Sequence, residues 1–108
     1  MLILPLKKEW YEKIRSGEKT VEYREVKPYW TKRLKIHTRE NFDITSLGQF
    51  YKFAEIDLPK CILRLGYTKR QMTADITKIE VVDGKDTDLR VDKPVYAIHL
   101  ANVRELEK

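Results

Sequence analysis

Between Gly17 and Arg24 the chain places a cation, a hydroxyl, a carboxylate and a guanidinium close together. Thr20, Glu22 and Arg24 alternate, so on a β-strand their side chains leave the same face. Such groups suit a pocket that reads a planar polar ligand, such as a nucleobase. The alternative is an exposed strand face with a Glu22–Arg24 ion pair of small energetic value. Strict alternation puts Lys19 on the side opposite Glu22, so their convergence requires a twist or bulge beside Gly17.

A helix over residues 8–16 and a strand over residues 19–25 are predicted to position these groups. Trp10 and Ile14 are four apart, which gives the helix an apolar stripe. We expect Trp10 to anchor the helix in the core rather than to stack on a ligand. Gly17 sits where a helix ends in a left-handed residue, and the strand is rich in Thr, Val and Tyr.

A second helix is predicted to begin at Pro28, a typical first-turn residue. Tyr29 and Trp30 lie next to the cations Lys32 and Arg33 in its sequence. Aromatic and basic residues side by side suit stacking on bases with phosphate contacts. The alternative is an amphipathic helix with a solvated basic face.

Residues 37–58 carry many aromatic and aliphatic residues with no single period. This segment is either an excursion into the core or a mobile flap over a site. We favour the core, because so many aromatic residues are costly to expose. Thr45 or Ser46 is expected to cap a short helix here.

The later sequence predicts strands at residues 61–65, 71–82 and 95–103, with a hairpin connection at residues 66–70. The buried positions of the middle strand switch from even to odd near Thr77, which predicts a bulge. The acid-rich run that starts at Asp83 lacks the spacing of a calcium loop and is read as a polar loop. His99, on the last strand, is expected to be a hydrogen-bonded histidine rather than a catalyst.

The chain has 108 residues, which fits a single domain over residues 1–108. The lone Cys61 cannot form an internal disulfide, and two distant histidines do not complete a zinc site, so we expect no metal and no cofactor. There is no signal-peptide pattern and no apolar run of membrane-spanning length, so we expect a cytoplasmic protein with no membrane association.

The net charge of +5 is unevenly distributed. Residues 1–40 hold 11 basic and 6 acidic residues, whereas residues 41–108 hold 11 of each. A basic patch on a small domain attracts phosphates, which favours a nucleic acid or a nucleotide as partner. The alternative is that a modest positive charge serves solubility.

Together the elements predict an α+β fold of about five mostly antiparallel strands with the helices grouped early. A sheet of this size with a bulge often curls into a small β-barrel.

The stretch Gly17-x-Lys19-x-x-Glu22-x-Arg24 resembles the GxKxxExR signature of the ASCH domain, whose barrel is similar to the PUA RNA-binding domain. The likeness to small bacterial and phage ASCH proteins covers residues 1–35 and 60–103, with residues 37–58 as an insertion. It extends to Glu9-Trp10-Tyr11, Ile14-x-Ser16-Gly17, Lys27-Pro28-Tyr29-Trp30-x-x-Arg33-Leu34 and Leu63-Arg64-x-Gly66-Tyr67.

The resemblance implies a PUA-like barrel with a cleft between the early helix, the motif strand and neighbouring loops, and RNA, a nucleotide or a modified nucleoside as ligand. In this binding interpretation a basic cleft surrounds the motif, and Glu22 accepts hydrogen bonds from a base edge. Phosphate contacts come from Lys19, Arg24, Lys32 and Arg33, stacking comes from Tyr29, Trp30 or Tyr67, and Thr20 and Arg64 complete the ligand-binding set.

The resemblance also allows an enzyme. Some bacterial relatives hydrolyse N4-acetylcytidine with a lysine, a threonine three residues later and a glutamate from a later helix. Lys19 matches the lysine, Glu22 stands in place of the threonine, and residues 84–94 are too short for that helix and offer no equivalent glutamate. In this hydrolase interpretation Lys19 activates water or polarises a carbonyl, and Glu22 accepts the proton. Other relatives cleave RNA, so a ribonuclease is a further alternative.

Overall fold

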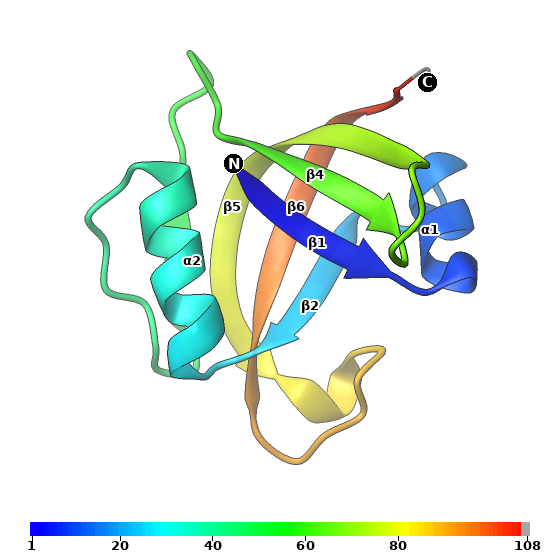
Figure 1. The fold of residues 1–108 in the computed structure, drawn as a ribbon. Helices are drawn as coiled ribbons and strands as arrows, with labels where there is room; N and C mark the ends of the chain where they lie inside the picture. Colours follow the sequence, from blue (N-terminus) through cyan, green and yellow to red (C-terminus); the bar gives the residue numbers. More distant parts are fainter. Residues whose placement is uncertain (107–108) are drawn as a thin grey trace.

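The computed structural model describes residues 1–106 and has an α+β architecture, as predicted (Figure 1). One sheet has the strand order β1-β4-β5-β6-β2, and β3 pairs with β5 beside that path. Every pair is antiparallel except β1 with β4. The elements are β1 (Leu2–Leu6), α1 (Lys8–Arg15), β2 (Val21–Glu25), α2 (Pro28–Thr38), β3 (Phe50–Lys52), β4 (Lys60–Leu65), β5 (Gln71–Asp83), the 3-10 turn η1 (Gly84–Asp86) and β6 (Pro94–Glu105).

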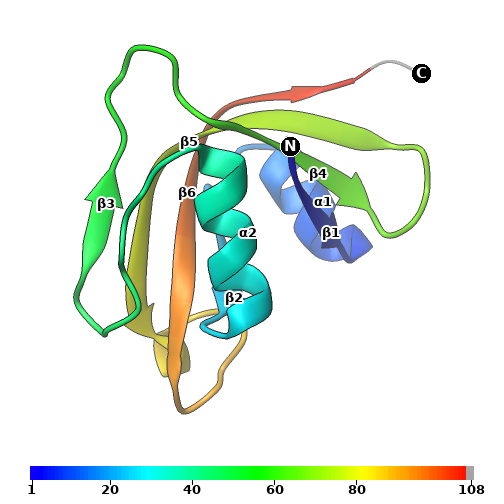
Figure 2. The same cartoon turned by 60° about the vertical axis from the view of Figure 1, so that its left-hand side comes forward.

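The sheet is curled because β5 and β6 slip register twice, between Thr73 and Asp75 and between Ile76 and Lys78. The second slip confirms the bulge predicted near Thr77. Bulges bend a strand and increase its twist, and the two long strands curve strongly (Figures 1 and 2). The curl brings the edge strands β1 and β2 close to each other, although no backbone pairing joins them within residues 1–106.

The core is built from the alternating inner faces of the strands. Leu2, Leu4 and Leu6 point inward from β1. From α1 the core receives Tyr11 and Ile14, which are fully buried, whereas Trp10 stays partly exposed. The expectation that Trp10 anchors the helix is therefore wrong, because the helix turns the neighbouring Tyr11 inward.

Residues 37–58 contribute to this core only in part, because Leu47, Phe50 and Ile56 are exposed. Phe42, Ile44 and Phe53 are buried with the main cluster. The expected helix capped at Thr45 or Ser46 does not form. The segment instead makes a turn and then strand β3, which stands beside β5 (Figure 2).

The two helices lie on opposite sides of the curled sheet (Figure 1). Helix α1 packs against β4 and β6, and α2 packs against β1. Neither helix of the described residues is long and apolar enough to cross a membrane.

Candidate functional site

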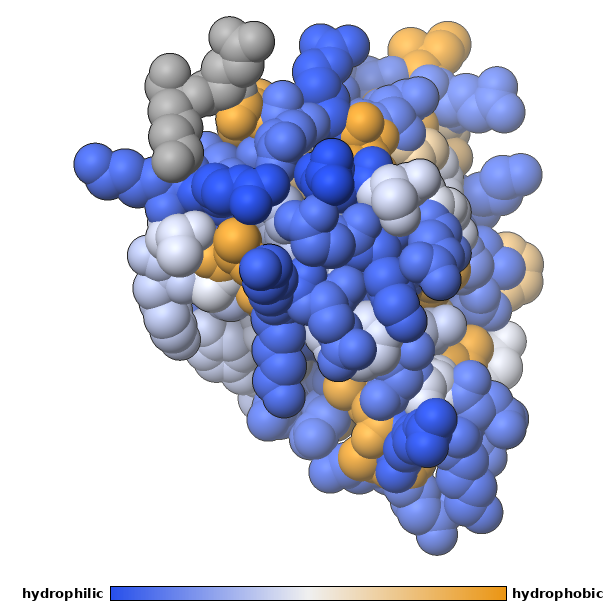
Figure 3. Space-filling view, turned by 90° about the vertical axis from the view of Figure 1, so that its right-hand side faces the viewer, coloured by the Kyte–Doolittle hydropathy of each residue, from blue (hydrophilic) through white to orange (hydrophobic). Residues whose placement is uncertain are grey.

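A hollow of about 280 Å³ lies between α1, the start of β2 and the β5–β6 connection. Its lining holds two lysines and two acidic residues, so it is nearly balanced in charge rather than basic. The surface seen from the α1 side is mainly hydrophilic, with apolar side chains in small separate spots (Figure 3). The hollow is lined by Trp10, Lys13, Glu18, Lys19, Thr20, Val21, Tyr23 and Asp88.

Lys19 reaches the hollow because the chain reverses before β2 begins. The Gly17 amide donates to the Ile14 carbonyl over 3.1 Å, and Gly17 has φ of 86°, a left-handed conformation that glycine adopts without strain. The Lys19 amide then donates to the Lys13 carbonyl over 3.0 Å. The predicted strand start at Lys19 is wrong, because β2 begins only at Val21. A turn at residues 16–18, rather than a twist or bulge within the strand, brings Lys19 to the hollow.

The Lys19 ammonium is nearly buried between two carboxylates and two aromatic rings. Its Nζ hydrogen-bonds Asp88 and lies 3.6 Å from Glu22 Oε1. It also lies 4.7 Å from the Tyr23 ring centroid and 5.4 Å from that of Trp10, within the range of cation–π attraction. An ammonium has three donors, and only the one to Asp88 is a protein hydrogen bond in the described residues. The other two donors have no hydrogen-bond partner among residues 1–106, and Glu22 Oε1 at 3.6 Å is the second carboxylate oxygen beside the ammonium.

The connection that carries Asp88 is held in shape by Gly84. The Gly84 carbonyl accepts from the Thr87 hydroxyl at 2.9 Å and from the Thr87 and Val91 amides at 3.3 Å. A Cβ at position 84 would lie 2.6 Å from the Lys93 carbonyl oxygen and 2.7 Å from that of Val91. Only a residue without a side chain fits there.

Sequence reasoning missed the role of Asp88. It assigned the acid-rich run to a polar loop, and no local spacing connects Asp88 to a lysine 69 residues earlier.

Glu22 and Arg24 lie behind the hollow, along the free edge of β2. Glu22 Oε1 accepts from the Tyr23 amide at 3.0 Å, and Arg24 Nη1 donates to the Tyr23 carbonyl at 2.7 Å. The two side chains also pair, with 3.1 Å between Arg24 Nη1 and Glu22 Oε2. Arg24 Nη2 reaches across to the Pro5 carbonyl of β1 at 2.8 Å. We call these four contacts the Glu22–Arg24 clamp. The last of them joins β2 to β1, between which residues 1–106 form no backbone pairing.

The aromatic and basic residues of α2 lie outside the lining of the Lys19 hollow. The Arg33 guanidinium stacks on the ring of its own neighbour Tyr29 at 3.5 Å. Trp30 is partly buried against the core and faces the Arg24 guanidinium at 5.2 Å. Lys32 is exposed and lines a separate hollow with Lys27, Pro28, Thr31, Lys35 and Val26, a lining without acidic residues.

Arg64 and Tyr67 are also outside the Lys19 hollow. The Arg64 guanidinium donates to Gln71 at 3.4 Å across the β4–β5 pair. Tyr67 is almost fully exposed at the hairpin tip. Of the ten residues proposed for the site, the structure brings Lys19 and Thr20 into the hollow and places Glu22 and Arg24 directly behind it.

The electrostatics of the hollow keep the Tyr23 phenol neutral. Burial raises its pKa, and the nearby carboxylates Asp88, Glu80 and Glu22 raise it further.

No group of three His, Cys, Asp or Glu residues within residues 1–106 is placed to hold a metal ion. The hollow therefore offers two ammonium groups, two carboxylates, a phenol and the rings of Trp10 and Tyr23. No family model, curated protein or solved structure matches this chain.

Proposed function

We propose that the Lys19 hollow binds a nucleoside with a cytosine-like base and that the chain is a small ASCH-type domain. The supporting observation is the nearly buried Lys19 ammonium, held beside Asp88 and between the rings of Trp10 and Tyr23. A pocket with aromatic walls and a few convergent polar groups is typical of a site for a flat polar ligand.

The hydrogen-bonding groups match one edge of cytosine. That base carries an exocyclic amine, which donates, and the carboxylate side chain is its usual protein acceptor. Asp88, whose side chain is 34% exposed, is available for this contact. In this proposal the remaining Lys19 donors hydrogen-bond to the ring nitrogen and carbonyl oxygen on the same edge of the base, and the base stacks on the Trp10 ring.

The balanced lining favours a neutral nucleoside over a phosphate inside the hollow. If the ligand is part of an RNA, the phosphates contact Lys27, just before α2, and Lys32 and Lys35 of α2, which share one surface hollow. RNA affinity should then fall as salt rises, because phosphate contacts release counterions. Free nucleoside affinity should change little over the same range.

Intrinsic fluorescence tests the proposal directly. The chain has two tryptophans, so Trp30→Phe leaves Trp10 as the only reporter, and it lines the hollow. In that background cytidine and N4-acetylcytidine should quench the emission with saturation. Lys19→Met should weaken binding at least tenfold, because a charged hydrogen bond contributes about 1.5–3 kcal/mol. Lys32→Met is the matched control and should leave nucleoside binding unchanged. Equal affinity in the Lys19 and Lys32 variants, or no saturable quenching, would reject the site.

A second function, hydrolysis of an N4-acyl group, is favoured by the contact between Asp88 and Lys19. The hydrolase interpretation lacked a carboxylate from the later part of the chain, and Asp88 provides one. In this proposal Asp88 replaces Glu22 as proton acceptor, since both Glu22 oxygens face protein donors. Lys19 polarises the acyl carbonyl, Asp88 takes a proton from the attacking water, and that proton passes to the departing nitrogen as the C–N bond breaks. The products are cytidine and a carboxylic acid.

Chromatography of N4-acetylcytidine incubated with the protein separates binding from turnover. Asp88→Asn should abolish product formation while quenching by cytidine persists, because the amide retains shape and hydrogen bonding but cannot take a proton. Saturable binding without any product in the unmodified protein would leave the binding function and exclude the hydrolase.

A further inference from the structure

A second hollow of about 230 Å³ adjoins the Lys19 hollow on the outer face of the sheet. Val21 and Tyr23 line both, so the two hollows are neighbours on the same face of β2. Its floor comes from β2, β5 and β6 and its rim from the β5–β6 connection. The lining is Val21, Tyr23, Glu80, Val82, Asp83, Asp86, Thr87, Ala97 and His99.

The polar centre of this second hollow is a histidine oriented by a carboxylate. His99 Nε2 lies 2.5 Å from Glu80 Oε2, and Lys78 Nζ lies 3.5 Å from the same oxygen. The register slip after Ile76 creates this pair, since it sets His99 opposite Lys78 and brings Glu80 onto the same face two residues on. Burial opposes ionisation of Glu80, but the hydrogen bond with His99 and the charge of Lys78 outweigh it and lower its pKa.

An ionised Glu80 fixes the imidazole tautomer. In a neutral imidazole, Nε2–H donates a hydrogen bond to the ionised carboxylate, which leaves Nδ1 with a free lone pair. No buried side-chain nitrogen or oxygen of the described residues lacks a partner. Nδ1 has no partner among residues 1–106 and is therefore open to solvent, in a side chain that lines the hollow.

We propose that the second hollow receives the sugar of the nucleoside and that His99 Nδ1 accepts a hydrogen bond from the ribose 2′-hydroxyl. The inference rests on the proposed nucleoside site and adds a preference for ribose over deoxyribose, because the 2′-hydroxyl distinguishes the two sugars. Val21, Val82 and Ala97 provide apolar contacts for the sugar carbons.

The negative charge of the second hollow argues against a phosphate group inside it. Its lining holds the acids Glu80, Asp83 and Asp86 and no lysine or arginine. A phosphate would meet like charges there, which weakens binding. The second hollow therefore favours a sugar whose phosphates, where the ligand has any, lie outside this lining.

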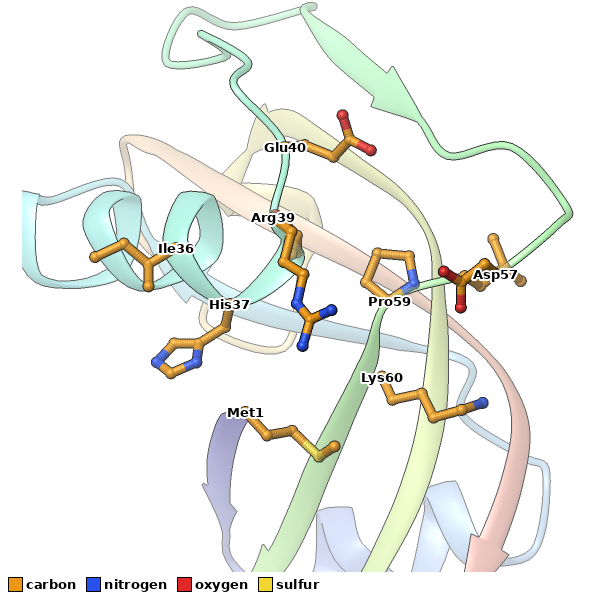
Figure 4. A pocket seen from close by; sticks show the side chains of 10 residues that line it. Met1, Ile36, His37, Arg39, Glu40, Asp57, Pro59 and Lys60 are labelled. Atoms are coloured by element: carbon orange, nitrogen blue, oxygen red, sulfur yellow. The ribbon is translucent and has the colours of Figure 1, made fainter.

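The test compares cytidine with 2′-deoxycytidine in the Trp30→Phe background. One hydrogen bond from a neutral hydroxyl should give cytidine about a fivefold to tenfold advantage. His99→Phe keeps a planar ring and should bring both sugars to the deoxycytidine affinity. His37→Phe is the matched control, because His37 lines a different hollow at the end of α2 (Figure 4). It should leave the preference unchanged.

The outcomes separate this inference from the site on which it rests. If neither nucleoside binds the unmodified pocket, the nucleoside site fails and the sugar assignment fails with it. If both bind equally, or if His99→Phe retains the preference, only the sugar assignment fails. A thermal melt checks the folding of each variant. If His99→Phe does not fold, Glu80→Ala replaces it: releasing the imidazole should reduce the ribose preference, and an unchanged preference would overturn the role of His99.

Discussion

Replacing Glu22 by alanine should destabilise the fold and not only the ligand site. The Glu22 side chain is 7% exposed, and its oxygens face the Tyr23 amide, the Arg24 guanidinium and the Lys19 ammonium. Removing one partner of a buried ion pair costs about 3–5 kcal/mol. Because Arg24 keeps its carbonyl acceptors and remains 16% exposed, we take the lower end, about 3 kcal/mol. For a domain of this size that corresponds to a fall in Tm of about 12–24 °C.

Thermal unfolding followed by circular dichroism measures this loss, and urea unfolding gives the free energy independently. Glu22→Gln should fall between the unmodified protein and Glu22→Ala, since the amide oxygen still accepts from the Tyr23 amide. Glu25→Ala is the matched control on the same strand: its carboxylate pairs with surface lysines, and exposed pairs contribute about 0–1 kcal/mol. A Tm of Glu22→Ala within about 4 °C of that of Glu25→Ala, a difference under about 1 kcal/mol, would refute the clamp.

Three further predictions concern other parts of the fold. Gly84→Ala should displace the connection that carries Asp88 and destabilise the protein by about 1–3 kcal/mol through overpacking. Urea unfolding measures the loss of stability, and quenching of Trp10 by cytidine measures the accompanying loss of binding. The Cys61 thiol, whose pKa burial raises to about 12, should resist iodoacetamide at pH 8 until the protein unfolds, and rapid labelling of the folded protein would contradict its burial. Burial alone would raise the pKa of Asp75, but hydrogen bonds from Lys60 and Asn102 outweigh it and lower the pKa. The unfolded chain thus binds more protons at this site, so stability should fall as pH drops through the acid range below the unfolded value of about 3.9, and Asp75→Asn should flatten that part of the curve.

Much of the local secondary structure could be predicted from the sequence. The helix end at Gly17 and the bulge near Thr77 follow from short-range rules, and the structure agrees with them. The parallel pairing of β1 with β4 has no local signature, because it joins segments about 60 residues apart.

The site was predictable only in part, for the same reason. Lys19 lies 3.6 Å from Glu22, but only Lys19 lines the hollow, so the two side chains do not share it as the motif suggested. Asp88 approaches them from a connection whose position depends on the whole sheet, and Trp10 was misassigned because helical spacing alone does not tell which of two adjacent aromatic residues faces inward. His99 was correctly expected to have a hydrogen-bond partner. The carboxylate that provides it, Glu80, is set by a register slip rather than by spacing along β6.

The contact between Asp88 and Lys19 joins the β5–β6 connection to the lining of the hollow, so under the proposed function ligand binding stabilises this connection. The connection is folded mainly by hydrogen bonds to Gly84, and its carboxylate is the nearest counter-ion of an ammonium that has little access to water. An outward movement of the connection would separate these charges, so the ion pair between Asp88 and Lys19 opposes that movement. A ligand that binds only the arrangement with the Asp88–Lys19 contact must, by linkage, slow amide exchange over residues 84–93. The expected factor is 1 + [L]/Kd, where [L] is the free ligand concentration and Kd its dissociation constant.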